Sequence, residues 1–160
     1  MNWQEICDNS LLQEIPFKIE TNQWGKIEMS PASNEHGLYQ VLIIEWLLKL
    51  AEGGRPISEC SIQTPKGVKV ADVAWGSYDF FQKNKRSNPY QESPEVVIEI
   101  LSPSNTLAEM KAKQELYFGQ GAKEFWVCDQ GNMMFFNRHQ VLKLSEIIMN
   151  FPVYLEIDFA

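Results

Sequence analysis

The sequence predicts a mixed α/β fold in which helices flank a central β-sheet. Three observations predict it: several strand-length runs of apolar residues, two longer segments of helical character, and the interleaved order of the two kinds along the chain. The 160 residues are close to the ~150 typical of one domain, so we expect a single domain over residues 1–160. A composition of 44% hydrophobic and 22% charged residues excludes a disordered or low-complexity chain.

The first elements are a short helical turn, a hairpin and a helix. Residues 17–20 and 26–29 alternate apolar and polar side chains, and Trp24-Gly25 between them is typical of a hairpin turn. Residues 34–51 are too continuously apolar for a strand, and Gly53-Gly54 follows them, so we expect a helix there. Because this helix is apolar nearly all round, we expect it to be largely buried.

A second hairpin and a central strand follow. Residues 57–64 and 68–75 are predicted strands joined by a Pro-Lys-Gly turn. A polar segment over residues 82–94 is predicted to be a loop. Residues 95–101 are apolar on both faces, as is typical of a strand covered on both sides.

A second helix is predicted after this strand, capped by Ser104 or Asn105 and ending near Phe118, where glycines follow. The remaining extended pieces are residues 124–128, 133–137 and 153–157.

Composition also restricts the class of protein. No stretch has the ~18 to 20 apolar residues of a membrane span, and the first residues lack a signal-peptide pattern, so we expect a cytoplasmic protein that engages no membrane. Three cysteines without a close pair indicate reduced thiols, and only two histidines accompany them, which argues against a structural zinc site. The net charge of −7, from 21 acids and 14 bases, argues against a broad nucleic-acid surface but not against a local basic groove.

Glu99 departs most clearly from the apolar pattern. In a strand over residues 95–101, it shares a face with Val97 and Leu101, so its carboxylate lies in an apolar row. Because an unpaired carboxylate is costly to bury there, we expect Glu99 to have a cation, a metal or a raised pKa. The alternative is an edge strand that leaves this position in solvent.

Asp72 and Lys113 are the next candidates. Asp72 also shares a strand face with apolar neighbours, and paired carboxylates on adjacent strands are common ligands of Mg²⁺; the alternative is an acid at a strand end or turn. Lys113 lies beside an apolar stripe of the second helix; the alternative is a surface ion pair with Glu109, four residues earlier. We expect Asp72, Glu99 and Lys113 to meet at one end of the sheet.

These residues occur in a pattern that resembles a known family. The small bacterial PD-(D/E)XK nuclease-like proteins, described as restriction endonucleases, are similar to this chain at Ala71-Asp72, at Val97–Ser104, and at Glu109, Lys113, Tyr117 and Gly121. The resemblance extends from about Gly25 to Asp129. It implies a restriction endonuclease-like core, in which a four-stranded mixed sheet is flanked by helices and one end holds an acidic divalent-metal site.

The resemblance also implies roles for the three main candidates. Asp72 matches the first acid of the motif, Glu99 the second acid, and Lys113 the lysine, which this family carries on the following helix. The parent motif places that lysine two residues after the second acid, where this chain has Leu101. Ala71 replaces a proline that shapes the backbone and binds nothing.

Three further residues join the predicted site. His36 matches a family histidine that faces the same site, Glu35 beside it is a candidate third metal ligand, and Tyr117 is a candidate catalytic residue. Judged without the resemblance, His36 is more typical of a helix start or surface, and Tyr117 of a core.

The densest basic cluster comprises Lys83, Lys85 and Arg86. On a flexible loop these three side chains could contact phosphates; the alternative is a solvated run of charge.

The leading hypothesis is an Mg²⁺- or Mn²⁺-dependent endonuclease that hydrolyses phosphodiester bonds of nucleic acid. The expected nucleic acid is DNA. Asp72 and Glu99 would hold the metal, and Lys113 would orient the attacking water or offset charge on the phosphate. Two alternatives keep the fold. One is a nucleic-acid- or protein-binding module with little turnover, and the other is a structural homodimer with the apolar tail over residues 147–159 as its interface.

Overall fold

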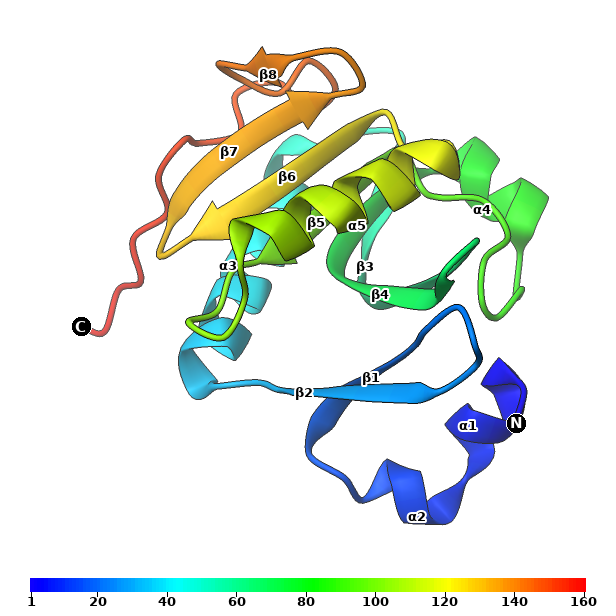
Figure 1. Ribbon diagram of the computed structural model, residues 1–160. Coiled ribbons are helices and arrows are strands. Elements are labelled where there is room, and N and C mark those ends of the chain that lie inside the picture. Colours follow the sequence, from blue (N-terminus) through cyan, green and yellow to red (C-terminus); the bar gives the residue numbers. More distant parts are fainter.

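The computed structural model, which describes residues 1–160, contains a six-stranded mixed sheet, a separate two-stranded sheet and five helices. The central sheet has the order β3-β4-β5-β6-β7-β8, and the two-stranded sheet formed by β1 and β2 lies beside it (Figure 1). The predicted mixed α/β class with a central sheet flanked by helices is confirmed. The central sheet has six strands, however, where the family resemblance implies four.

The central sheet brings the two predicted acids side by side. Its strands are β3 (Gly54–Thr64), β4 (Gly67–Ser77), β5 (Val96–Ile100), β6 (Glu124–Asp129), β7 (Asn132–Asn137) and β8 (Val141–Leu142). β5 and β6 are parallel and joined by α5 (Leu107–Gly119), whereas all other neighbours are antiparallel. Val73 pairs with Ile98 across β4 and β5. The same register, continued by one residue, sets Asp72 opposite Glu99 on one face.

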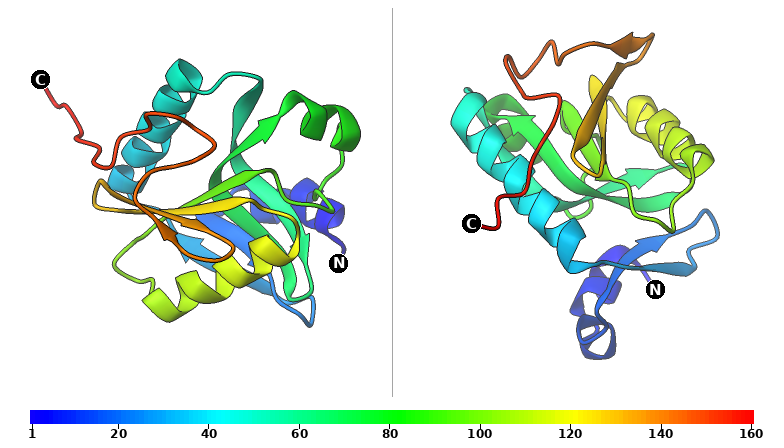
Figure 2. Two further views of the ribbon diagram at one scale, coloured as in Figure 1. Left: turned by 90° about the horizontal axis from the view of Figure 1, so that it is seen from above. Right: turned by 90° about the vertical axis from the view of Figure 1, so that its left-hand side faces the viewer.

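Helices cover both faces of the central sheet. α3 (Asn34–Leu50) and the chain after β8 pack on one face, and α5 with α4 (Tyr78–Asn84) on the other (Figure 2). β5 lies between β4 and β6, so its side chains alternate between two apolar cores. Ile98 enters the core under α3, whereas Val97 enters the core under α5. The expected two-sided burial of this strand is confirmed, and the edge-strand alternative for Glu99 is wrong.

The N-terminal segment adds a second layer near the site. It consists of α1 (Trp3–Asp8), α2 (Ser10–Gln13) and the predicted hairpin of β1 (Phe17–Thr21) and β2 (Ile27–Pro31). The hairpin lies across one end of the central sheet (Figure 1).

Side chains of β1 attach this hairpin to β4. The Glu20 carboxylate accepts a hydrogen bond from Val70 N–H (2.7 Å), and the Thr21 hydroxyl accepts one from Val68 N–H (2.8 Å). Gly67, with φ +91°, allows the two turns to touch, because a Cβ there would lie 2.4 Å from backbone oxygens of Thr21 and Asn22. The hairpin is therefore fixed against the central sheet by buried contacts.

Several local expectations need correction. α3 has nearly the predicted bounds but is not largely buried: Tyr39, Ile43 and Leu47 form one buried stripe, while Val41 and Leu48 are exposed. The polar segment over residues 82–94 is not entirely a loop, because α4 extends to Asn84. Ser77 caps α4 by accepting from Phe80 N–H, which stabilises a helix start that polar composition hides.

Two further corrections concern the second half of the chain. α5 is capped by Thr106, which forms a capping box with Glu109, and not by Ser104 or Asn105. Residues 153–157 form no strand; Tyr154 makes a single bridge to Asn132.

The apolar tail over residues 147–159 is partly used by the chain's own core. Ile148, Phe151 and Leu155 are buried in the core under α3, whereas Val153 and Phe159 remain exposed. The homodimer interface therefore stays a hypothesis. None of the helices combines the length and hydrophobicity needed to cross a membrane.

Candidate active site

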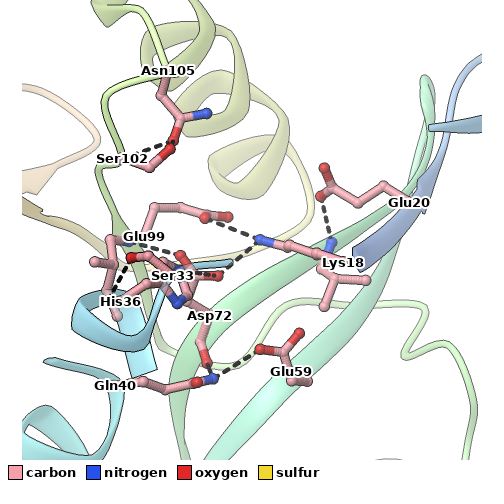
Figure 3. A network of polar contacts seen from close by, with 12 residues as sticks. Lys18, Glu20, Ser33, His36, Gln40, Glu59, Asp72, Glu99, Ser102 and Asn105 are labelled. Carbon is pink, nitrogen blue, oxygen red and sulfur yellow. Dashed lines mark hydrogen bonds and ion pairs between the residues drawn. The ribbon is translucent and has the colours of Figure 1, made fainter. Parts of the chain in front are cut away.

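Three carboxylates, two lysines and a histidine meet where the β1–β2 hairpin approaches β4, β5, α3 and α5 (Figure 3). We call this group the acid–lysine cluster; its members are Lys18, Glu20, His36, Asp72, Glu99 and Lys113. The structure thus brings together Asp72, Glu99, Lys113 and His36, as predicted, and adds Lys18 and Glu20.

Asp72 is 2% exposed and has both carboxylate oxygens occupied. Its Oδ1 lies 3.0 Å from Lys18 Nζ and 3.2 Å from His36 Nε2, and its Oδ2 accepts a hydrogen bond from Ile100 N–H (2.8 Å). The alternative of a solvated acid at a strand end or turn is therefore wrong. The three partners stabilise the ionised form of the carboxylate.

Glu99 is also 2% exposed and is the centre of the cluster. Its Oε2 lies 3.3 Å from Lys18 Nζ, while its Oε1 accepts from the Tyr117 hydroxyl (2.8 Å) and lies 3.4 Å from Lys113 Nζ. Tyr117 is fully buried in the core under α5, and its hydroxyl end satisfies Glu99. Tyr117 is thus both a core residue and a direct support of the carboxylate.

Lys113 is positioned by the start of α5. The Thr106 cap sets the helix phase, and Lys113 then reaches Glu20 Oε2 (3.0 Å) as well as Glu99. Glu109 is used in the capping box, so the alternative of a Glu109–Lys113 surface pair is wrong.

Lys18 links the two strand acids, since its Nζ contacts both Asp72 and Glu99. It enters from β1, where Lys18 and Glu20 occupy alternate positions on the same face of the hairpin. The sequence reasoning missed both residues because alternating charge in a short hairpin is also typical of a solvated face. The contacts that bury them join residues 54 and 93 positions apart.

His36 and Glu35 lie in the first turn of α3, which Ser33 begins by accepting from His36 N–H (3.1 Å). His36 turns toward Asp72, whereas Glu35 is exposed and contacts neither Asp72 nor Glu99. Glu35 lines an adjoining cavity of about 270 Å³ together with His36 and Asp129. The structure therefore does not bring Glu35 into the cluster.

Burial and the nearby lysines, Lys18 and Lys113, shift the pKa values of the two strand acids. Burial would raise the pKa of Asp72, but Lys18, His36 and the Ile100 N–H hold this pKa well below its ordinary value. Burial raises the pKa of Glu99 to about 7, although Lys113 and Lys18 act in the opposite direction.

The pKa values of Lys18 and His36 are raised above their ordinary values. Burial lowers the pKa of Lys18, but attraction to Glu99 and Asp72 outweighs this effect and raises the pKa above its ordinary value. The contact with Asp72 raises the pKa of His36, although burial lowers it. Lys18 is therefore a permanent cation, and His36 holds its proton to a higher pH than a free histidine.

The donor set is suited to a hard divalent cation. Mg²⁺ is commonly held by one or two carboxylates, with water and substrate phosphate completing its shell. Asp72 and Glu99 supply two carboxylates that already share one cation, the Lys18 ammonium. A cavity of about 50 Å³ adjoins both acids and Lys113, which is space for about one water or ion. No group of three or more His, Cys, Asp or Glu side chains is placed to hold a metal ion.

The predicted basic cluster lies elsewhere. Lys83 is on α4 and pairs with Glu92 (2.8 Å), and Lys85 and Arg86 follow the helix. None of these three residues lines the cavities that adjoin the acid–lysine cluster. Their contact with nucleic acid stays a prediction.

The fold and site together define a restriction endonuclease-like α/β protein. A mixed sheet carries one acid on each of two adjacent antiparallel strands, and the helix after the second strand supplies the lysine. The chain belongs to the Uma2 family, described as "Putative restriction endonuclease", whose model matches residues 12–146. The resemblance to this family is confirmed.

A solved structure supports the fold. The crystal structure of "a putative nuclease belonging to DUF820" from Anabaena variabilis ATCC 29413 aligns with a TM-score of 0.67 and 17% sequence identity, over 87% of each chain. No curated protein matches the chain.

Proposed function

We propose that this protein is a metal-dependent nuclease that hydrolyses phosphodiester bonds of nucleic acid. DNA is the substrate that we expect. The main observation in support is a pair of buried carboxylates, Asp72 and Glu99, which lie on adjacent strands with the Lys18 ammonium between them. Two buried acids facing each other are costly unless a cation compensates them. Membership of the family supports the same assignment.

Asp72 and Glu99 would hold Mg²⁺ or Mn²⁺. When bound, such a metal lowers the pKa of an attacking water and offsets charge on the phosphate. The nearby Ile100 N–H and Tyr117 hydroxyl hold the two carboxylates in fixed orientations, as preorganised ligands require.

Lys113 and His36 complete the chemistry. Lys113 lines the cavity beside Glu99, so its ammonium can donate hydrogen bonds to the attacking water or to a phosphate oxygen. His36 lies 3.2 Å from Asp72 Oδ1 through its Nε2, so it would help to position the carboxylate that holds the metal. The water oxygen bonds to phosphorus and releases a proton to solvent while the opposite P–O bond breaks, and the leaving oxygen takes up a proton from solvent.

A cleavage assay tests this proposal. At low salt with Mn²⁺, Mg²⁺ or EDTA, we expect the wild type to cut plasmid and oligonucleotide DNA only with metal. Glu99→Gln and Asp72→Asn should abolish cutting. Glu124→Gln is the matched control, because Glu124 is equally buried, at 2% exposure, on the neighbouring β6 but bonds to Trp126 and Ser145. Thermal unfolding verifies that each variant folds, and metal-dependent cutting by Glu99→Gln would refute the assignment.

A second candidate function is a nucleic-acid-binding module with little turnover. It is favoured by one observation: Lys18 and Lys113 already neutralise Asp72 and Glu99 without any metal. Binding of nucleic acid that Asp72→Asn leaves unchanged, with no cleavage in either metal, would support this second function.

A further inference from the structure

The tip of the β1–β2 hairpin carries an aromatic side chain that the fold does not use. Trp24 is 74% exposed, although tryptophan is among the most costly side chains to leave in water. It lines a cleft of about 520 Å³ between the hairpin and α5, which we call the hairpin cleft. An exposed tryptophan at the wall of a cleft is an available stacking surface.

The hairpin turn holds Trp24 in a defined position. The Asn22 side chain accepts hydrogen bonds from Trp24 N–H and Lys26 N–H, both 3.0 Å long. Gly25, with φ +73°, closes the turn by donating to Asn22 O (3.0 Å). Because these bonds fix the backbone of the turn, stacking of a ring on Trp24 has only the side chain to order.

The cleft that Trp24 lines also contains an unpaired lysine. The β3–β4 turn touches the hairpin at Gly67, and this contact brings Lys66 to the same cleft. Lys66 is exposed and forms no ion pair. Of the three acids that line the cleft, Glu20 pairs with Lys113 and Glu28 with Lys69, while Glu109 caps α5. Three lysines and three glutamates balance formally in this lining, and Lys66 is the lysine that forms no ion pair.

The hairpin cleft leads to the acid–lysine cluster. Ser30, Met110 and Lys113 line both this cleft and the small cavity beside Asp72 and Glu99. The other adjoining cavity, of about 270 Å³, is lined by Glu35, His36 and Asp129 but by no lysine or arginine. Lys66 therefore offers an approaching phosphate an unpaired lysine in the hairpin cleft, and the 270 Å³ cavity has none.

We propose that the hairpin cleft binds an unpaired strand of nucleic acid, with a base stacked on Trp24 and a neighbouring phosphate on Lys66. An unpaired strand is favoured because only unstacked bases offer a face to an aromatic side chain, whereas a duplex needs a broad basic surface, which a net charge of −7 argues against. The inference rests on the proposed function, because it takes the acid–lysine cluster as the place where this strand is cut.

Binding without metal tests the inference separately from catalysis. Fluorescence anisotropy with labelled single-stranded DNA, single-stranded RNA and blunt duplex DNA is measured at low salt in EDTA. We expect the wild type to bind a single strand more tightly than the duplex, and the DNA and RNA arms identify the preferred sugar. Trp24→Ala should weaken single-strand binding about tenfold, Trp24→Phe should largely restore it, and Lys66→Ala should weaken it several-fold.

Two controls use comparable residues at the start of α4 and just after its end. Tyr78→Ala removes another exposed aromatic side chain, and Lys85→Ala removes a lysine of the predicted basic cluster. Equal affinity of Trp24→Ala and wild type, equal losses in the α4 variants, or tighter binding of duplex would each overturn the inference. None of these results depends on cleavage, so loss of metal-dependent cutting would refute the proposed function alone.

Discussion

The Lys18 ammonium contacts the same two carboxylates, Asp72 and Glu99, that would bind a metal ion, so the two cations would compete. Its ammonium lies within 3.3 Å of an oxygen of both Asp72 and Glu99, inside a cluster that also contains Lys113. In a buried site, one positive charge at this distance offsets much of the repulsion between two acids. Lys18 therefore stabilises the metal-free protein and opposes metal binding through the same contacts.

Replacing Lys18 with methionine separates these two effects. Without metal, Lys18→Met should destabilise the fold by roughly 3 to 5 kcal/mol, because two buried acids lose their shared cation. Mn²⁺ should then bind at least tenfold more tightly than to wild type, and should raise the melting temperature of the variant by more. Thermal unfolding in EDTA and in a Mn²⁺ series measures both quantities. Lys83→Met, at an exposed pair, is the control, and a smaller metal response in Lys18→Met would contradict the prediction.

Glu99 should make stability depend on pH. Burial raises its pKa from 4.5 to about 7, so the folded state binds a proton more tightly than the unfolded state. This contribution to stability is complete below pH 4.5 and is lost as pH rises through about 7. In EDTA, wild type should therefore lose stability relative to Glu99→Gln between these pH values, by at most about 1.4 kcal/mol per pH unit. Urea unfolding of both proteins across this range is the measurement, and a constant difference would show that Glu99 does not titrate there.

At the scale of elements, the contact between two turns places the hairpin over the site. Gly67 and Gly121 both have positive φ, +91° and +104°, but only Gly67 has backbone atoms where a Cβ would stand. This pair allows backbone strain to be separated from the contact.

Gly67→Ala should cost more stability than Gly121→Ala. Both variants pay for a strained φ, on the order of 1 kcal/mol, but only Gly67→Ala must also push the hairpin away from β4. We expect an additional loss of about 1 to 3 kcal/mol, together with weaker single-strand binding, because Trp24 and Lys66 move apart. Urea unfolding and anisotropy test both effects, and equal losses in the two variants would show that the turns do not depend on this contact.

Elements whose pattern is local were predicted well, and those that depend on caps or tertiary contacts were not. β5 shows its two-sided burial directly in the run of apolar residues around Glu99. The last residues of α4 have the polar pattern of a loop, and only the Ser77 cap indicates a helix there. α3 was expected to be largely buried, yet only one stripe faces the sheet, since exposed apolar side chains are common on a folded surface.

At the scale of the whole molecule, the site is assembled from two sheets. Asp72, Glu99 and Lys113 belong to the central sheet and its crossover helix, so their convergence follows from a strand pattern and the family resemblance. Lys18 and Glu20 belong to the separate hairpin. Their burial follows only from how that hairpin docks on β4, which no periodicity of a short segment specifies. Two of the six charged groups of the acid–lysine cluster, Lys18 and Glu20, were therefore outside the reach of sequence reasoning.

The charge of the whole molecule makes a last prediction about binding. With a net charge of −7 and one unpaired lysine in the hairpin cleft, few phosphates can be neutralised at once. For single strands, the logarithm of affinity falls with the logarithm of salt concentration by about 0.7 for each phosphate neutralised. Contacts with Lys66 and one or two groups of the acid–lysine cluster then predict a slope of roughly −1 to −2.

Anisotropy titrations over a range of salt concentrations measure this slope. Lys66→Ala should make it shallower by about 0.7, whereas Lys85→Ala, at a lysine that does not line the hairpin cleft, should leave it unchanged. A slope steeper than about −4 would require a basic surface of several lysines and arginines. That result would indicate that nucleic acid binds at Lys83, Lys85 and Arg86 and not in the hairpin cleft, because no other segment of the chain is as densely basic.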